Sequence, residues 1–276
     1  MQGEIQVSGA VLKYERFGAG LPLVVLHGGP GVGYRYMLPE LREALNGCGE
    51  LIFYDQRASG HSTGAERPDL LTIDVFVEDL AQVCPARAMI LGHSFGGLLA
   101  MQFGVRHPNR VSAMILVDGD PASRRLWQQH TGRIGPVTAD RAGDAAAWWQ
   151  AAMAPRFANR ASMPADFGQR LADARPENLL GVAAAVRASL GDWDLHGELH
   201  RIASPVLVVR GDKSIYPDEA FSILCANLPD AELVTLPNAS HFPFIEAAAE
   251  FREAVRGFIR RVRRPADRSP RPAAQG

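Results

Sequence analysis

A serine flanked by glycines and a histidine late in the chain are the residues whose types and spacing best indicate chemistry. Ser94 lies in Gly92-His93-Ser94-Phe95-Gly96, directly after the apolar run 88–91 and directly before a helical segment. This G-x-S-x-G pattern at a strand-to-helix turn is typical of a nucleophile elbow, in which the tight turn lifts the serine hydroxyl out of the sheet. His241 follows the last apolar run, so it comes after Ser94 in the order expected of its general base. The alternative is a serine-glycine turn that only joins a strand to a helix.

Backbone amides near Ser94 are expected to stabilise negative charge on a carbonyl oxygen under attack. The loop His27-Gly28-Gly29-Pro30-Gly31 follows the apolar run 21–26, and its glycines leave N–H groups open to a ligand. We predict an oxyanion hole made by the amides of Gly29 and Phe95, with Gly28 as the next candidate. The alternative for this loop is an ordinary Gly-Pro turn.

Alternating strands and helices must position these residues. Strands are predicted at 5–7, 11–17, 21–26, 51–54, 88–91, 111–117, 205–209 and 232–236, and helices at about 37–46, 72–83, 95–107 and 247–263. This alternation indicates an α/β protein with a mostly parallel, eight-stranded sheet covered by helices on both faces. Such sheets bind ligands at the carboxyl ends of their strands.

The strand pattern stops between about residues 121 and 200, where only helical segments are indicated. We therefore predict a core made of 1–120 and 201–262, a helical cap at 121–200, and a disordered basic tail at 263–276. The cap holds all four tryptophans, which are candidates for packing within the cap or for the walls of an apolar substrate pocket. They are Trp127, Trp148, Trp149 and Trp193.

Three motifs together resemble the proline iminopeptidase branch of the α/β-hydrolases. They are His27-Gly28-Gly29-Pro30-Gly31, Asp55-Gln56-Arg57-Ala58-Ser59-Gly60-His61-Ser62 and Gly92-His93-Ser94-Phe95-Gly96-Gly97. The resemblance covers about 1–118 and 203–262 and is weak across the insertion. It implies the α/β-hydrolase fold, acylation of Ser94 by a carbonyl substrate, and deacylation by water. Ala58 departs from the family, which usually has glycine there.

The acid that should orient His241 is the main departure from this resemblance. Relatives usually carry it as the fourth residue of a G-x-x-D turn, which here reads Gly211-Asp212-Lys213-Ser214. Ser214 therefore stands at the expected position, and a serine cannot hold an imidazolium by charge. Asp212 on the same turn is one replacement.

Asp118, at the end of the strand 111–117, is the other replacement for the acid. It follows Ser94 by 24 residues, a spacing that resembles certain haloalkane dehalogenases. We favour Asp118 over Asp212 and leave Asp120, or no acid at all, as further alternatives. An aspartate that only ends a strand is the reading of Asp118 without chemistry.

The composition excludes several classes of partner. The chain has 276 residues and a formal net charge of −1, which gives no reason to expect nucleic acid or an acidic membrane as a partner. The three cysteines are scattered, and no basic leader or membrane-spanning run is evident, so we expect a cytoplasmic protein. His196 and His200 are spaced i, i+4 but lack a third ligand, so we expect no metal and no cofactor.

These features predict a serine hydrolase that cleaves an ester or amide bond in a small, partly apolar molecule or a short peptide. An aminopeptidase similar to proline iminopeptidase and an esterase or lactonase both remain open. The insertion shows no pattern of acidic residues that would hold a substrate's free amine. The missing acid at Ser214 keeps a third class open, a non-hydrolytic lyase or ligand receptor on the same scaffold. The sequence leaves the oligomeric state undetermined.

Overall fold

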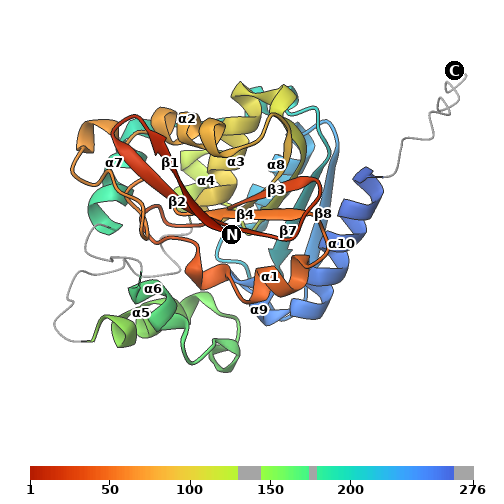
Figure 1. Ribbon diagram of the computed structural model, residues 1–276. Coiled ribbons are helices and arrows are strands. Elements are labelled where there is room, and N and C mark those ends of the chain that lie inside the picture. The colour runs from red at the N-terminus through yellow and green to blue at the C-terminus, as the bar shows by residue number, and fades with distance from the viewer. Residues whose placement is uncertain (130–143, 174–178, 264–276) are drawn as a thin grey trace, which may run out of the picture.

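An eight-stranded sheet forms the centre of the computed structural model, which describes residues 1–129, 144–173 and 179–263 (Figure 1). The strands are β1 (Gln2–Val7), β2 (Ala10–Phe17), β3 (Pro22–Leu26), β4 (Glu50–Tyr54), β5 (Ala88–His93), β6 (Val111–Val117), β7 (Val206–Gly211) and β8 (Ala231–Leu236). Their order is β1-β2-β4-β3-β5-β6-β7-β8. Only the β1–β2 and β2–β4 pairs are antiparallel. The predicted mostly parallel, eight-stranded sheet is confirmed.

The central strands are apolar because both faces of the sheet are covered. Every residue of β5 and of β7 is buried. Alternate side chains of β3 enter two separate hydrophobic clusters, with Val24 and Leu26 in one and Leu23 and Val25 in the other. This two-residue period explains why the strands read as continuous apolar runs rather than as alternating patterns.

Two sets of helices cover the two faces of the sheet. The flanking α-helices are α1 (Glu40–Leu45), α2 (Ile73–Val83), α3 (Phe95–Arg106), α8 (Asp218–Asn227), α9 (Pro243–Glu246) and α10 (Ala248–Arg263). Residues of α2, α3 and α8 belong to one cluster, and those of α1, α9 and α10 belong to the other. Thr72 caps α2 by accepting a hydrogen bond from the Val75 amide, as its position predicts. The last helix runs to Arg263, and the predicted tail beyond it lies outside the described residues.

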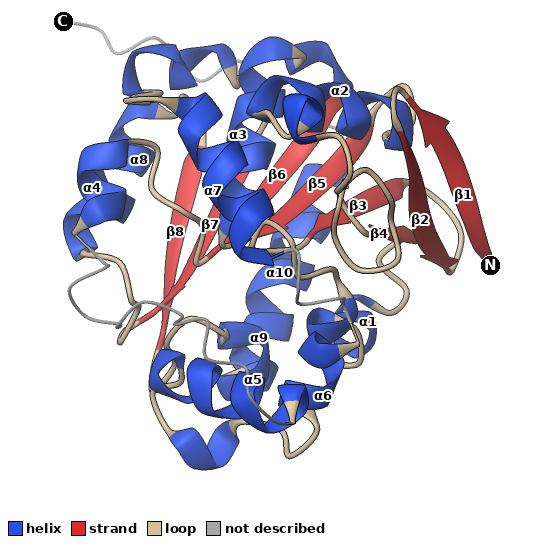
Figure 2. Cartoon of the chain, turned by 90° about the vertical axis from the view of Figure 1, so that its left-hand side faces the viewer, coloured by secondary structure: helices blue, strands red, loops and turns tan. Residues whose placement is uncertain are grey.

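Between β6 and β7 the described residues form helices and turns and no strand. The α-helices are α4 (Arg124–Gln128), α5 (Ala145–Met153), α6 (Phe167–Ala172) and α7 (Leu179–Leu190). α5 and α6 lie side by side at the end of the molecule away from α2 and α3, and α7 lies across the strands (Figure 2). We propose that 121–200 is a cap on a core formed by 1–120 and 201–262. Within the described ranges, no helix has the length and apolar character needed to cross a membrane.

Candidate active site

Ser94 occupies a sharp turn between β5 and α3 that only small neighbours permit. Its φ of 53° and ψ of −124° are unusual for a residue with a side chain. A Cβ atom on Gly92 would lie 2.2 Å from the Gly96 carbonyl oxygen, and one on Gly96 would lie 2.4 Å from the Leu26 carbonyl oxygen. The two glycines of the motif are therefore required by close backbone approach, and the turn that they permit presents Ser94 at the strand end.

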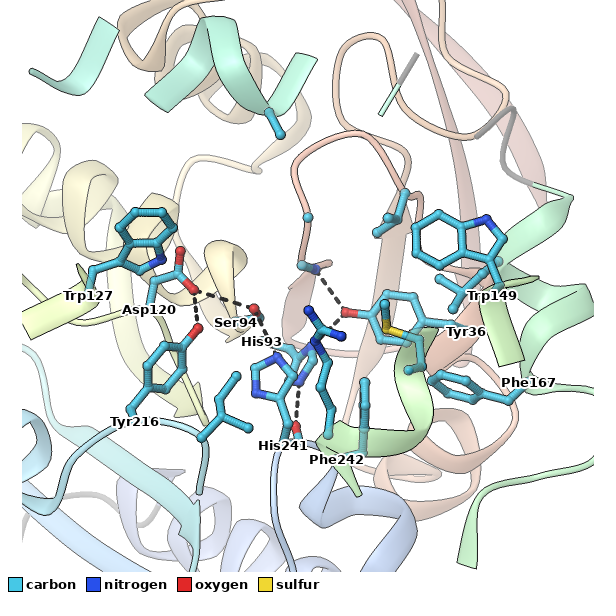
Figure 3. Close-up of a pocket in the computed structure, with 18 of the residues that line it drawn as sticks. Tyr36, His93, Ser94, Asp120, Trp127, Trp149, Phe167, Tyr216, His241 and Phe242 are labelled. Atoms are coloured by element: carbon cyan, nitrogen blue, oxygen red, sulfur yellow. Dashed lines mark hydrogen bonds between the residues drawn. The ribbon is translucent and has the colours of Figure 1, made fainter. Parts of the chain in front are cut away.

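His241 joins Ser94 to a buried carboxylate. Its Nε2 atom lies 3.1 Å from Ser94 Oγ, and its Nδ1 atom lies 2.6 Å from Asp118 Oδ2. Figure 3 shows the Ser94 hydroxyl and the His241 ring facing one another in the pocket. With Nδ1–H donated to Asp118, Nε2 is left as the acceptor for the serine proton, which is the tautomer a general base requires.

Asp118 lies at the end of β6, fully buried, with a positive φ of 38°. Burial raises the pKa of Asp118 to about 7, while the nearby Ser214 side chain and the positive charge of Arg210 oppose that shift. Ser214, which stands where relatives usually carry the acid, therefore lies near the carboxylate that reaches His241. Asp212 is exposed, and its carboxylate accepts a 3.3 Å hydrogen bond from the Ala239 amide. Of the two candidate acids, Asp118 is the one in contact with His241.

A second carboxylate lies beside the serine. Asp120 Oδ1 is 3.4 Å from Ser94 Oγ and accepts a 2.5 Å hydrogen bond from the Tyr216 hydroxyl (Figure 3). Its Oδ2 atom forms a 2.8 Å ion pair with Arg187 of α7. The Arg187 guanidinium also lies 4.1 Å from the centre of the Trp127 ring. Asp120 thus enters the site as a carboxylate already paired with a cation.

A buried chain of hydrogen bonds fixes the His241 loop. His93 Nε2 lies 2.7 Å from the His241 carbonyl oxygen and must donate to it, which leaves Nδ1 to accept from the Tyr36 hydroxyl at 2.6 Å. The Tyr36 oxygen in turn accepts from the Gly28 amide at 2.9 Å. Burial lowers the pKa of His93 to about 3, so this imidazole stays neutral across the working range of pH. His93 therefore positions the base without titrating.

The glycine-rich loop is held by the second motif of the sequence. Gln56 donates its backbone N–H to His27 Nε2 at 3.0 Å, and Ser59 Oγ accepts from the Gly31 backbone N–H at 3.1 Å. The Gly28 amide already donates to Tyr36, so it could serve as an oxyanion donor only by leaving that bond. Gly29 and Phe95 remain the candidates for the oxyanion hole.

The pocket above Ser94 is lined mainly by apolar side chains from the core and the insertion. Trp127 and Trp149 are among its lining residues. Trp193 is buried in the cluster beneath α7, and Trp148 packs at the edge of the cluster that contains Trp149. The structure therefore brings two of the four predicted tryptophans to the pocket.

The sequence did not indicate four polar pocket residues as candidates for contact with a substrate. They are Tyr36, Arg156, Arg187 and Tyr216. Tyr216 follows the turn that ends in Ser214, so its place after β7 was a usable signal, whereas the two arginines lie in helical segments without a motif. His196 pairs with Asp194 at 2.6 Å, and the described residues hold no cluster of three or more potential metal ligands.

Comparison with known proteins gives the class of this chain. The model of the alpha/beta hydrolase family matches residues 23–254. The chain therefore belongs to that family and is a hydrolase by relationship, with the fold that the resemblance implied.

Its relatives carry different hydrolase activities. The chain is 26% identical to a proline iminopeptidase of Heyndrickxia coagulans, over 95% of this chain and 99% of that protein. It is 30% identical to a pimeloyl-[acyl-carrier protein] methyl ester esterase of Aeromonas salmonicida, over 90% and 99% of the two chains. Among solved structures, the proline iminopeptidase of Mycobacterium smegmatis superposes with a TM-score of 0.78 at 25% identity, covering 95% and 98% of the two chains. The similarity to proline iminopeptidases is thus shared with esterases.

Proposed function

We propose that this protein is a serine hydrolase that cleaves an ester or amide bond through an acyl-Ser94 intermediate. The observation that carries the proposal is the continuous contact from Ser94 Oγ to His241 Nε2 at 3.1 Å and from His241 Nδ1 to Asp118 Oδ2 at 2.6 Å. The nucleophile, the acid and the base follow three different strands, β5, β6 and β8. A structural role would not require all three side chains to meet.

The acylation step follows from this geometry. His241 Nε2 accepts the Ser94 proton as Oγ attacks the substrate carbonyl carbon, and the imidazolium is stabilised by the Asp118 carboxylate. The carbonyl oxygen becomes an oxyanion that accepts hydrogen bonds from the Gly29 and Phe95 amides, the latter at the N-terminus of α3. Collapse of the tetrahedral intermediate expels the leaving group, which takes the proton from Nε2.

Deacylation repeats the same proton transfers with water. A water molecule gives a proton to His241 Nε2 and attacks the acyl carbon, and the proton then passes to Ser94 Oγ as the acid product leaves. Neither step needs a metal or an organic cofactor. The substrate is a small, partly apolar molecule or a short peptide, because the pocket walls are mainly apolar.

The charges in the pocket favour esters over peptides with a free amino terminus. An aminopeptidase must hold the ammonium group of its substrate, which calls for a carboxylate able to pair with it. Asp120 is the only carboxylate among the described lining residues, and Arg187 and Tyr216 already hold it. An esterase or lactonase therefore fits the described part of the pocket better.

An aminopeptidase is the second candidate because curated proline iminopeptidases are among the relatives that match nearly the whole chain. A non-hydrolytic lyase or ligand receptor is the alternative that rests on the missing acid at Ser214. Asp118 contacts His241 in its place, which argues against that alternative.

The discriminating experiment compares turnover of a 4-nitrophenyl ester of a short fatty acid with turnover of proline 4-nitroanilide. We expect saturable ester hydrolysis that the Ser94→Ala substitution abolishes, and much lower kcat/KM on the anilide. A higher kcat/KM on the anilide would establish the aminopeptidase. No Ser94-dependent turnover of either compound would contradict the hydrolase proposal.

A further inference from the structure

We propose that Arg156 binds a carboxylate carried by the substrate, so that the enzyme selects acyl compounds with an anionic group. This inference rests on the proposed hydrolase function and names a substrate class for the same pocket. Arg156 ends a short 3-10 helix, Ala154–Arg156, which directly follows α5. It lines the pocket together with Trp149 and Met153 of α5.

The backbone fixes Arg156 next to the proposed base. The His241 amide donates a 3.1 Å hydrogen bond to the Arg156 carbonyl oxygen. Arg156 also lines the same pocket as Ser94, Tyr216 and His241. The positive charge is therefore close to the reacting groups rather than at the outer rim of the insertion.

The Arg156 guanidinium has more N–H donors than the described residues accept from it. Within the described residues, its guanidinium makes one hydrogen bond, from Nη1 to the Ala152 carbonyl oxygen at 2.6 Å, and no carboxylate lies within ion-pair distance of it. A guanidinium carries five N–H donors in a planar fork that matches a carboxylate. Arg156 is half-buried, and burial lowers the pKa of its guanidinium.

The other pocket arginine differs in this respect. Arg187 is paired with Asp120 at 2.8 Å and stacked on Trp127 at 4.1 Å. The described lining residues thus contribute two guanidinium groups and one carboxylate, which leaves one positive charge in excess. A partly buried, unpaired cation is costly unless a ligand compensates it, and a substrate carboxylate provides both the charge and two hydrogen bonds.

The test uses pairs of esters that differ only in one charge. One pair is the 4-nitrophenyl half-ester of glutarate and 4-nitrophenyl 5-methylhexanoate, in which an isopropyl group replaces the carboxylate. The other pair places the charge on the alcohol, as 3-(butanoyloxy)benzoate and 3-isopropylphenyl butanoate. We expect the wild-type enzyme to prefer the anionic member of at least one pair.

The Arg156→Met substitution keeps the apolar stem and removes the charge. We expect it to lower kcat/KM for the preferred anionic ester by about 10- to 100-fold more than that of its neutral partner. Arg156→Lys should retain part of the preference. Arg160→Met is the matched control, because Arg160 is exposed in the same segment and does not line the pocket. It should leave both ratios unchanged.

A binding measurement separates this inference from the proposed function. Titration calorimetry of glutarate with wild-type protein should show binding that Arg156→Met weakens at least tenfold, whether or not the chain turns over esters. Hydrolysis of neutral esters with no anionic preference would overturn the role of Arg156 while leaving the hydrolase intact. Equal glutarate affinity in wild-type and Arg156→Met proteins, or no glutarate binding at all, would also overturn it.

Discussion

The substitution Asp118→Asn should separate catalysis from stability in this protein. Asparagine has nearly the same shape as aspartate but carries no charge, so it can no longer stabilise the His241 imidazolium or enforce its tautomer. Loss of the acid in a serine triad lowers kcat by up to about 10⁴. We expect a comparable loss here, since Asp118 is the carboxylate in contact with His241 Nδ1.

The same substitution should also change how the free energy of unfolding depends on pH. Burial raises the pKa of Asp118 from 3.8 to about 7, so between these values the folded state binds a proton that the unfolded state has lost. Wild-type stability from this group is fully present below about pH 4 and is lost as the pH rises through 7. The asparagine side chain does not titrate, so the substituted protein avoids that loss.

Urea unfolding at pH 4.5 and pH 8.5, together with kcat at pH 8, provides the assay. The free energy of unfolding of Asp118→Asn relative to wild type should rise from the acidic to the alkaline condition. Asp212→Asn is the control and should change neither kcat nor this difference, because Asp212 is exposed and does not contact His241. A kcat within tenfold of wild type for Asp118→Asn, or loss of activity in Asp212→Asn, would refute the assignment.

Three further substitutions test the neighbouring acid position, the hydrogen-bond chain through His93 and the left-handed backbone at Ala58. Ser214→Asp introduced into the Asp118→Asn protein should raise its kcat by more than tenfold, because Ser214 lies near the Asp118 carboxylate; unchanged kcat would speak against interchangeable acid positions. Tyr36→Phe removes the partner of His93 and should lower kcat about tenfold with little change in KM, as steady-state kinetics would show. Ala58→Gly relieves a φ of 56° and should raise Tm by about 2–4 °C in a thermal melt, and a lower Tm would contradict this.

Much of the core and of the site could be predicted because chain order and residue type determine them. Parallel strands bury both faces and so read as apolar runs, and the motif around Ser94 required glycines at its two ends. The spacing of Asp118 from Ser94 identified the carboxylate that meets His241. Ala58 shows why the family has glycine at that position, since its backbone is in the left-handed region.

The pocket chemistry could not be read in the same way. Whether Arg156 or Arg187 faces a ligand depends on how helices of the insertion pack over the sheet, and neither residue has a sequence motif. The role of Asp120 was also obscure, because its pairing with Arg187 joins residues 67 positions apart. The same packing decides which tryptophans reach the pocket, and the rings of Trp148 and Trp193 pack into the hydrophobic clusters instead.

The most direct test of the central claim is covalent labelling of the nucleophile. Wild-type protein treated with a fluorophosphonate should gain one adduct per chain by intact mass, and peptide mapping should place it on Ser94. Ser94→Ala should gain none, and Asp118→Asn should react far more slowly. An unlabelled wild-type protein, or an adduct on a different residue, would contradict Ser94 as the nucleophile.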